Sequence, residues 1–289
     1  MIYLRHFKNP PSLTIAAQVT SAAERPGSIP ICAIHGWLDN SGSFRPLMEM
    51  HPKWPWVACD LIGHGQSAWR TPDAFYYFHD YLCDLGLWLE NTYPNGVHLM
   101  GHSLGAAITS LLAGLFPDKV KSLILFDGIG PLVSTCDAFP EQFRLSLKQF
   151  QSPRPLRGYE SLEAMALARQ KRHLIELRST EILAQYGHRI NEKGLYEWTF
   201  DPKLFGLSPI QLTQEQVIAT LTQIQCPVFF LKANQGYPYE PTLLAERIAA
   251  IRNIETLHID GGHHVHMDCY RSVSELIDSF YERHNIRFQ

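Results

Sequence analysis

One stretch of this sequence, Gly101-His102-Ser103-Leu104-Gly105, matches the pattern G-x-S-x-G. A mainly apolar run at 97–100 predicts a buried strand before it, and the small and apolar residues at 106–113 predict a helix after it. A strand that turns at once into a helix, with an exposed side chain at the apex, needs small residues on both sides of that apex. We therefore interpret Ser103 as a nucleophile at a strand-to-helix turn. The alternative is a serine that only caps the helix through its hydroxyl.

Three further motifs lie on either side of this turn: Ile34-His35-Gly36-Trp37, residues 60–67 (DLIGHGQS) and Gly261-Gly262-His263-His264. In this order, and with Ser103 between them, they resemble the motifs of the α/β-hydrolase superfamily. The combination of Ser103 with Phe126-Asp127-Gly128 and the run at 262–268 is most similar to its serine hydrolase-like group. The resemblance spans nearly the whole chain. It implies the α/β-hydrolase fold, with a mostly parallel central sheet flanked by helices and an inserted helical cap.

Hydropathy patterning predicts three parts of the chain. Residues 1–130 form the first part of the α/β-hydrolase core, because their apolar runs are typical of parallel strands buried on both faces. Residues 131–225 are rich in Glu, Gln, Arg and Leu, and three of their segments have helical periodicity, at 143–150, 161–172 and 181–190. The resemblance implies that this part is the helical cap. Residues 226–289 complete the core with two more strands and a final helix.

The N-terminal residues predict a separate antiparallel feature. Residues 2–7 and 13–19 are rich in residues that favour strands, and Asn9-Pro10-Pro11 lies between them. We expect two antiparallel edge strands that are joined by a turn.

Composition is that of an ordinary soluble enzyme. The chain has 289 residues, of which 45% are hydrophobic, and its formal net charge is −3 without long runs of either sign. We therefore expect a small-molecule substrate and neither nucleic acid nor a membrane as partner, while the oligomeric state stays open. The N-terminus lacks the apolar core of a signal peptide and no run is long enough to span a bilayer, so we expect a cytoplasmic protein. The six scattered cysteines predict buried hydrophobes rather than disulfides or zinc ligands.

The resemblance assigns roles to four residues. Ser103 is the nucleophile, and His263 is the base because Gly262-His263 matches the family's Gly-His pair; His264 is the fallback. In the family, the residue after the first His-Gly pair donates its backbone N–H to the oxyanion. Trp37 takes that role here, together with the N–H of Leu104. The alternative for Trp37 is a wall of the substrate pocket.

The triad carboxylate does not lie where most relatives carry it. The loop after Leu231 contains Asn234 and Gln235, which cannot carry the charge. Asp127 follows the predicted strand at 120–126, at the sheet edge that also carries Ser103 and His263. We predict Asp127 as the triad acid, and the alternative is that it only caps the start of the linker to the cap. Weaker candidates are Asp60, Glu240 and Asp260.

Two clusters of side chains could indicate other chemistry. One comprises His263, His264, His266 and Asp268, but the sequence shows no second group of ligands to accompany it, so we predict no metal site. The other is a set of basic residues with acidic neighbours in the cap, which predicts a solvated helix face rather than an anion-binding patch. Its members are Arg154, Arg157, Arg169, Lys171 and Arg172.

Together these patterns predict a serine hydrolase that acts on a small carboxylic ester through an acyl-enzyme, without a cofactor. Serine at the turn argues against haloalkane dehalogenases and epoxide hydrolases, which carry Asp there. Hydrolysis of another acyl or C–C bond, and acyl transfer, stay open on the same scaffold. A non-catalytic small-molecule binder with this fold is the hypothesis from a different class, and failure to react with a fluorophosphonate probe would favour it.

Overall fold

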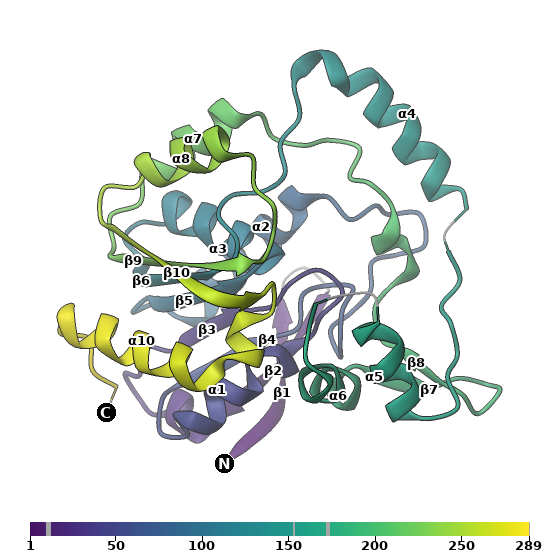
Figure 1. Ribbon diagram of the computed structural model, residues 1–289, viewed down its shortest axis with the longest axis horizontal. Coiled ribbons are helices and arrows are strands. Elements are labelled where there is room, and N and C mark those ends of the chain that lie inside the picture. The colour runs from purple at the N-terminus through teal and green to yellow at the C-terminus, as the bar shows by residue number, and fades with distance from the viewer. Residues whose placement is uncertain (10–12, 153, 172–173, 289) are drawn as a thin grey trace.

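The computed structural model describes residues 1–9, 13–152, 154–171 and 174–288. Its centre is a sheet of eight strands in the order β1-β2-β4-β3-β5-β6-β9-β10 (Figure 1). The pairs β1–β2 and β2–β4 are antiparallel, and the other neighbours are parallel. The strands are β1 (Ile2–Asn9), β2 (Leu13–Thr20), β3 (Ile31–Ile34), β4 (Trp56–Cys59), β5 (Val97–His102), β6 (Val120–Phe126), β9 (Val228–Gln235) and β10 (Ile254–Gly262).

The N-terminal strands differ from the prediction in one respect. β2 pairs with both β1 and β4, so only β1 lies at the sheet edge and the expectation of two edge strands is wrong. β2 is pulled inward because most of its side chains are apolar and buried. Of the predicted turn, Pro10 and Pro11 lie outside the described residues.

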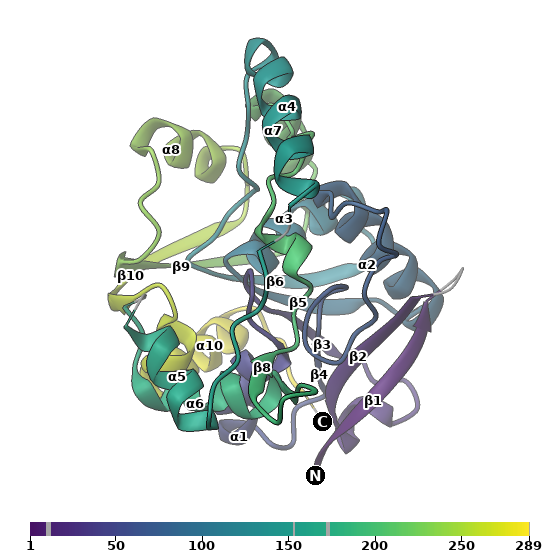
Figure 2. The same cartoon turned by 90° about the vertical axis from the view of Figure 1, so that its right-hand side faces the viewer.

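Helices cover both faces of the sheet and give the molecule two apolar cores (Figure 2). One face carries α2 (Phe78–Thr92), α3 (Leu104–Leu115), α7 (Gln214–Leu221) and α8 (Pro241–Ala249). The other face carries α1 (Arg45–Met50) and α10 (Tyr270–Arg283). Ten of the twelve residues of α3 are buried, because the helix runs directly over the sheet between its neighbours.

A segment between β6 and β9 has a small apolar core of its own. The segment contains α4 (Phe139–Phe150), α5 (Leu162–Gln170), α6 (Leu177–Tyr186) and the antiparallel ribbon of β7 (His188–Ile190) and β8 (Tyr196–Trp198). In Figure 1, α5, α6 and the ribbon lie together, and α4 projects away from them. The helix predicted at 181–190 is too long, because α6 ends at Tyr186 and Gly187 leads into β7.

Helix α7 lies inside the segment predicted as the cap but packs on α3 and α8 in the layer that covers the sheet. The reason is topological. β6 and β9 are parallel neighbours, and a connection between parallel strands has to cross back over the sheet, usually as a helix. Helix α7 is that crossover, so the predicted boundary at residue 225 includes a core helix.

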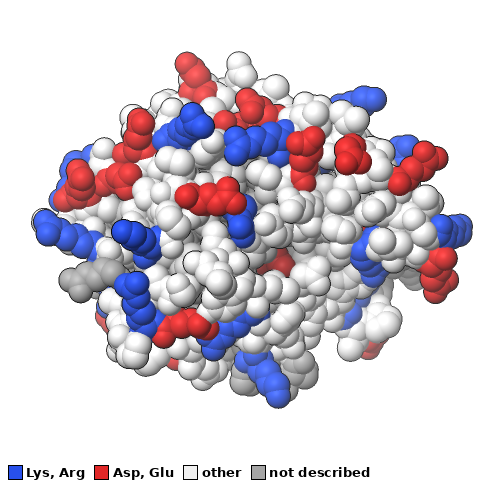
Figure 3. Space-filling view, turned by 90° about the horizontal axis from the view of Figure 1, so that it is seen from below, with Lys and Arg blue, Asp and Glu red and all other residues white. Residues whose placement is uncertain are grey.

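The surface gives two negative results for the described part of the chain. None of the helices found there is long and apolar enough to cross a membrane. On the face shown in Figure 3, basic and acidic side chains are intermingled and do not gather into one large patch of a single sign.

Candidate active site

The turn between β5 and α3 holds Ser103 in a strained conformation. Ser103 has φ 51° and ψ −114°, and left-handed φ values of this kind are unfavourable for a residue with a side chain. The glycines of the motif make the turn possible. A Cβ on Gly105 would lie 1.9 Å from the carbonyl oxygen of Ile34, and a Cβ on Gly101 would lie 2.5 Å from the Cα of Ala106. The motif is therefore a packing requirement of this turn.

Asp127 and His263 meet at the same edge of the sheet. Asp127 follows the end of β6, and His263 follows the end of β10. The Nδ1–H of His263 donates a hydrogen bond to Oδ2 of Asp127 at 2.5 Å. The Asp127 side chain is fully buried, whereas the His263 side chain is 29% exposed. Since Nδ1 faces the carboxylate, Nε2 is the ring nitrogen that remains to exchange a proton.

The Asp127 carboxylate accepts three more hydrogen bonds. The donors are Lys232 Nζ at 2.7 Å, the Ala233 N–H at 3.1 Å and the Tyr237 N–H at 2.6 Å. Burial has the largest effect and raises the pKa of Asp127, but the hydrogen bonds from His263, Lys232 and Tyr237 outweigh it. The net result is a lowered pKa, which keeps the carboxylate ionised at neutral pH. Sequence reasoning missed Lys232, although a lysine within the apolar run of β9 is a signal for a buried partner.

The other acidic candidates have different partners. Glu240 caps α8, where it accepts hydrogen bonds from the N–H groups of Thr242 and Leu243. Asp60 holds the loop after β4 through the N–H groups of Ser41 and Gln66, and Asp260 accepts a hydrogen bond from Asn234. Among the described residues, Asp127 is thus the carboxylate in contact with the His263 ring.

Of the two predicted oxyanion donors, Trp37 lines the same cavity as Ser103, and Leu104 directly follows Ser103 in the chain. Leu104 is the first residue of α3, so its N–H has no acceptor within the helix. Within the described ranges, neither this N–H nor that of Trp37 donates a hydrogen bond to the protein. Trp37 lines the cavity, and its side chain is held there by a hydrogen bond from Nε1–H to the Leu204 carbonyl at 3.0 Å. The two roles considered for Trp37 are therefore compatible.

A cavity of about 420 Å³ joins these groups, which is a usual size for a small-molecule site. Ser103 and His263 lie on its core side. Aromatic and apolar residues of the inserted segment line the other side, namely Leu156, Tyr159, Trp198, Phe200 and Phe205. Four aromatic residues of the segment predicted as the cap therefore reach the cavity.

Arg169 contradicts the prediction of a solvated basic face. Its side chain is only 11% exposed, and its guanidinium group pairs with Asp39, donates to the Leu38 carbonyl at 2.8 Å and lies over the Trp198 ring. The partner is buried in the loop after β3, so the ion pair joins α5 to the loop that carries Trp37. Arg154 and Arg157 are exposed but also line the cavity, Lys171 is exposed, and Arg172 lies outside the described residues.

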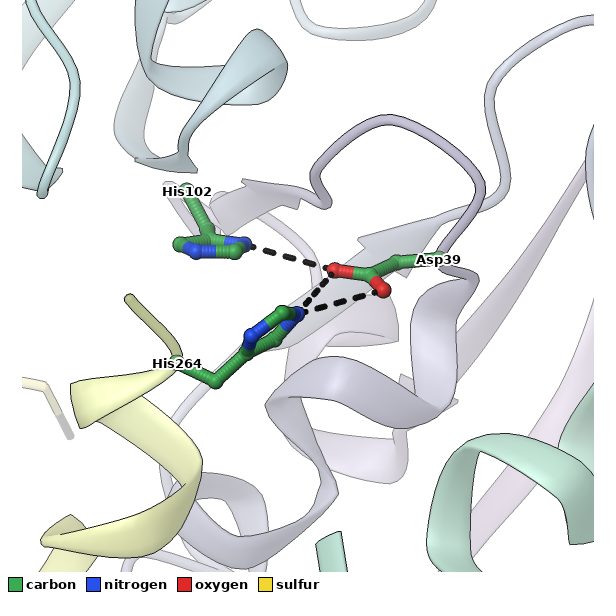
Figure 4. Close-up of side chains that lie close together, drawn as sticks. All are labelled: Asp39, His102 and His264. Atoms are coloured by element: carbon green, nitrogen blue, oxygen red, sulfur yellow. Dashed lines mark hydrogen bonds and ion pairs between the residues drawn. The ribbon is translucent and has the colours of Figure 1, made fainter. Parts of the chain in front are cut away.

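Two histidines also approach Asp39, as Figure 4 shows. His102 Nδ1 lies 3.4 Å and His264 Nε2 lies 3.2 Å from Oδ2 of Asp39. His264, the fallback base, thus contacts Asp39 and not Asp127. Burial lowers the pKa of His102 to about 4, so this imidazole is neutral at neutral pH.

The remaining members of the histidine-rich motif, His266 and Asp268, have other hydrogen-bond partners. His266 is hydrogen-bonded to the Ser43 hydroxyl at 2.6 Å, and Asp268 accepts a hydrogen bond from the Ser179 hydroxyl at 2.5 Å. The four side chains grouped in the sequence therefore do not converge on one point.

Comparison with known proteins agrees with this geometry. A family model described as the alpha/beta hydrolase fold matches residues 29–156. A "Probable serine hydrolase" of Drosophila melanogaster is 31% identical, over 88% of this chain and 80% of its own length. A "Serine hydrolase-like protein" of Danio rerio is 28% identical, over 87% of this chain and 81% of its own. The crystal structure of a hypothetical protein from Pseudomonas aeruginosa has a TM-score of 0.87 at 32% identity, over 98% of this chain and 99% of that one.

The chain belongs to the α/β-hydrolase superfamily, in its serine hydrolase-like group. The predicted fold class is confirmed. The family also supports the coarser functional prediction of a hydrolase.

Proposed function

We propose that this chain is a serine-dependent hydrolase of small carboxylic esters that works through an acyl-enzyme. The observation that supports this most strongly is the hydrogen bond between His263 and the buried Asp127, on the cavity that Ser103 also lines. A binder without catalysis has no need for a strained serine beside an oriented imidazole. The partner in this proposal is the small-molecule substrate alone, and no cofactor takes part.

The reaction has two halves. Ser103 Oγ attacks the ester carbonyl carbon while Nε2 of His263 takes the hydroxyl proton, and the Trp37 and Leu104 N–H groups stabilise the oxyanion. The tetrahedral intermediate collapses as the C–O bond to the alcohol breaks, and the imidazolium gives its proton to the leaving oxygen. Water then attacks the acyl-enzyme, with His263 again as the base, and releases the carboxylic acid and free Ser103. Asp127 holds the imidazole in the required tautomer and stabilises the imidazolium.

The inserted segment supplies aromatic and apolar residues to the cavity, and also Arg154 and Arg157. The apolar part of this lining supports an uncharged acyl or alcohol group as the part of the substrate that is bound there. In this proposal, most of the segment predicted as the cap shapes the pocket, and α7 belongs to the core. Chromogenic acyl esters of graded chain length test this part, because the apolar wall should favour chains of intermediate length over acetate.

Replacement of the nucleophile is the primary test. Ser103→Ala should abolish labelling by a fluorophosphonate probe and lower the turnover of a chromogenic ester by up to about a million-fold, because the triad acts as a unit. Thermal denaturation should show nearly unchanged stability. Retained activity, with labelling of another serine, would show that Ser103 is not the nucleophile. A wild-type protein that folds but neither labels nor turns over any ester would favour the binder.

A further inference from the structure

Three potential metal ligands from distant parts of the sequence converge beside the nucleophile. Asp39 comes from the loop after β3, His102 ends β5, and His264 precedes the short helix α9 (Val265–Asp268). One ligand atom from each lies within 4.8 Å of the others (Figure 4). All three residues also line the cavity that contains Ser103, so a solute that enters the cavity reaches them.

The hydrogen bonds of His102 show which ring nitrogen carries its proton. Nε2 lies 2.9 Å from the backbone carbonyl oxygen of His263, and a carbonyl can only accept, so Nε2 carries the hydrogen. In the neutral ring, Nδ1 then presents a lone pair. That lone pair faces Oδ2 of Asp39 at 3.4 Å, and the buried Nδ1 has no hydrogen-bond partner among the described residues. Two acceptors that face each other in this way leave a place for a cation.

His264 can complete the same set. Its Nε2 lies 3.2 Å from the same Asp39 oxygen, and its buried Nδ1 has no hydrogen-bond partner in the described part of the chain. Transfer of the ring proton from Nε2 to Nδ1 turns the hydrogen bond to Asp39 into a third lone pair that points at the same place.

The surroundings match those of ligating side chains in metal sites, whose other polar atoms are held by hydrogen bonds. The His263 carbonyl holds Nε2 of His102, and Arg169 holds Oδ1 of Asp39, so that Oδ2 of Asp39 faces the two imidazoles. Gly36 leaves the necessary space. A Cβ there would lie 2.8 Å from His102 Nδ1 and 3.1 Å from Asp39 Oδ2.

We propose that Asp39, His102 and His264 form an inhibitory site for a divalent transition metal such as Zn²⁺. Two imidazoles and one carboxylate suit zinc and its neighbours, whereas Mg²⁺ and Ca²⁺ prefer oxygen ligands. The metal is not a cofactor here, because the proposed reaction does not use it.

Inhibition follows from the movement that binding requires. Ligands at the usual zinc distances of about 2.0–2.2 Å are only about 3.3 Å apart in a tetrahedron. The ring nitrogens of His102 and His264 already lie about that far from Asp39 Oδ2, at 3.4 and 3.2 Å, but the three ligand atoms spread over up to 4.8 Å, so the two rings must move toward each other. His102 directly precedes Ser103 and holds the His263 backbone, and His264 directly follows His263. A shift of these rings therefore displaces the nucleophile and the base from each other.

Binding is tested without substrate, so the result does not depend on the proposed esterase activity. ZnCl₂ is titrated into chelator-stripped protein in a calorimeter. The wild type should bind one Zn²⁺ per chain, and His264→Gln should weaken the dissociation constant at least about ten-fold. The control is His258→Gln, which removes an exposed histidine and should leave binding unchanged. Absence of zinc binding by the wild type, or equal binding by His264→Gln, would overturn the site.

A second measurement needs no variant. Co²⁺ added to the wild type should give the intense visible absorption of a tetrahedral site, and excess Zn²⁺ should remove it. Only the weak bands of octahedral cobalt would contradict the proposal even if His264→Gln failed to fold.

The inhibitory part is tested with a chromogenic ester. Zn²⁺ should lower the turnover of the wild type at the concentration at which it binds, and EDTA should restore it. His264→Gln should need at least about ten-fold more Zn²⁺ for the same fractional loss. Zinc that binds at this site without lowering turnover would refute the inhibitory role. An inactive wild type that still binds one Zn²⁺ would instead count against the proposed function alone.

Discussion

Asp127 combines full burial with four hydrogen bonds, and this combination defines its chemistry at the scale of the single residue. Three of the four donors keep the carboxylate charged and fixed in position. The fourth donor is the His263 ring, and the negative charge of Asp127 stabilises this ring when it becomes protonated.

Neutralising this carboxylate tests its role. Asp127→Asn should lower the turnover of a chromogenic ester at least about a hundred-fold, because an amide cannot stabilise the imidazolium and favours the wrong tautomer. Glu240→Gln and Asp260→Asn are the matched controls and should each change the rate less than about ten-fold. Circular dichroism should show that all three variants fold. Near-normal turnover of Asp127→Asn, with a large loss in one of the controls, would move the triad acid to that residue.

At this scale, sequence reasoning located residues whose position depends on a local pattern or on a strand end. Ser103 is defined by its own motif, and Asp127 and His263 were predicted to share one sheet edge, where the structure brings them into contact. Asp39, Arg169 and Lys232 were not predicted as members of the site. Their contacts join residues more than a hundred positions apart, and no local periodicity reports such a contact.

Among the elements, α5 and the loop after β3 are coupled most directly at the site. Arg169 donates both to the Leu38 carbonyl and to the Asp39 carboxylate, and it also lies over Trp198. Trp37, whose N–H is a proposed oxyanion donor, precedes both acceptors in the chain. The inserted segment therefore holds the loop that carries Trp37 in place.

Removal of this guanidinium should affect stability and catalysis together. Arg169→Met leaves the buried Asp39 carboxylate without its cationic partner, which should lower the free energy of unfolding by about 3–5 kcal/mol. Release of the loop should lower kcat about ten-fold or more, with a smaller change in KM. Urea denaturation and steady-state kinetics measure the two effects.

Two other substitutions distinguish the paired contacts between Arg169 and the loop after β3 from the effect of the charge alone. Arg169→Lys keeps the charge but loses the paired contacts, so it should recover only part of the loss. Lys171→Met removes an exposed cation near the same helix end and should behave as the wild type. A change in KM alone, with unchanged stability, would show that Arg169 does not hold this loop in place.

The element boundaries that the sequence missed share a physical cause. Helical periodicity at 181–190 continues past Gly187, so it cannot show where α6 gives way to a strand of three residues. The amphipathic pattern of α7 is that of any surface helix, and its place in the core layer follows from the crossover between parallel strands. The long buried strands were easier to predict, because their apolar runs are continuous.

For the whole molecule, buried neutral histidines link folding to pH. Burial lowers the pKa of His98 from 6.5 to about 4, and burial also lowers the pKa values of His35 and His64. Between pH 6.5 and about 4, the unfolded chain therefore binds protons that the folded chain does not. Stability rises with pH wherever the unfolded state binds more protons, so it should fall as the pH is lowered through this window.

His98 gives the measurable case, since it lies away from the active site and is hydrogen-bonded to Ser122. Its titration should contribute about 2 kcal/mol to the difference in unfolding free energy between about pH 7 and pH 5. Urea denaturation at both values should show a difference smaller by that amount in His98→Gln than in the wild type. An equal pH dependence in the two proteins would show that His98 is protonated in the folded state.

The two ends of the inserted segment are joined to each other by backbone hydrogen bonding. Val133 and Leu212 form an isolated bridge between chain portions, and the Ser134 N–H donates to the Leu212 carbonyl at 3.0 Å. Because these two parts of the chain lie side by side, the connection from β6 through α7 to β9 could be joined there without the residues between them. Residues 134–211 can therefore lengthen, shorten or be exchanged in evolution or by grafting while the sheet keeps its connectivity. A graft that also supplies an arginine for Asp39 would give Ser103 a new pocket.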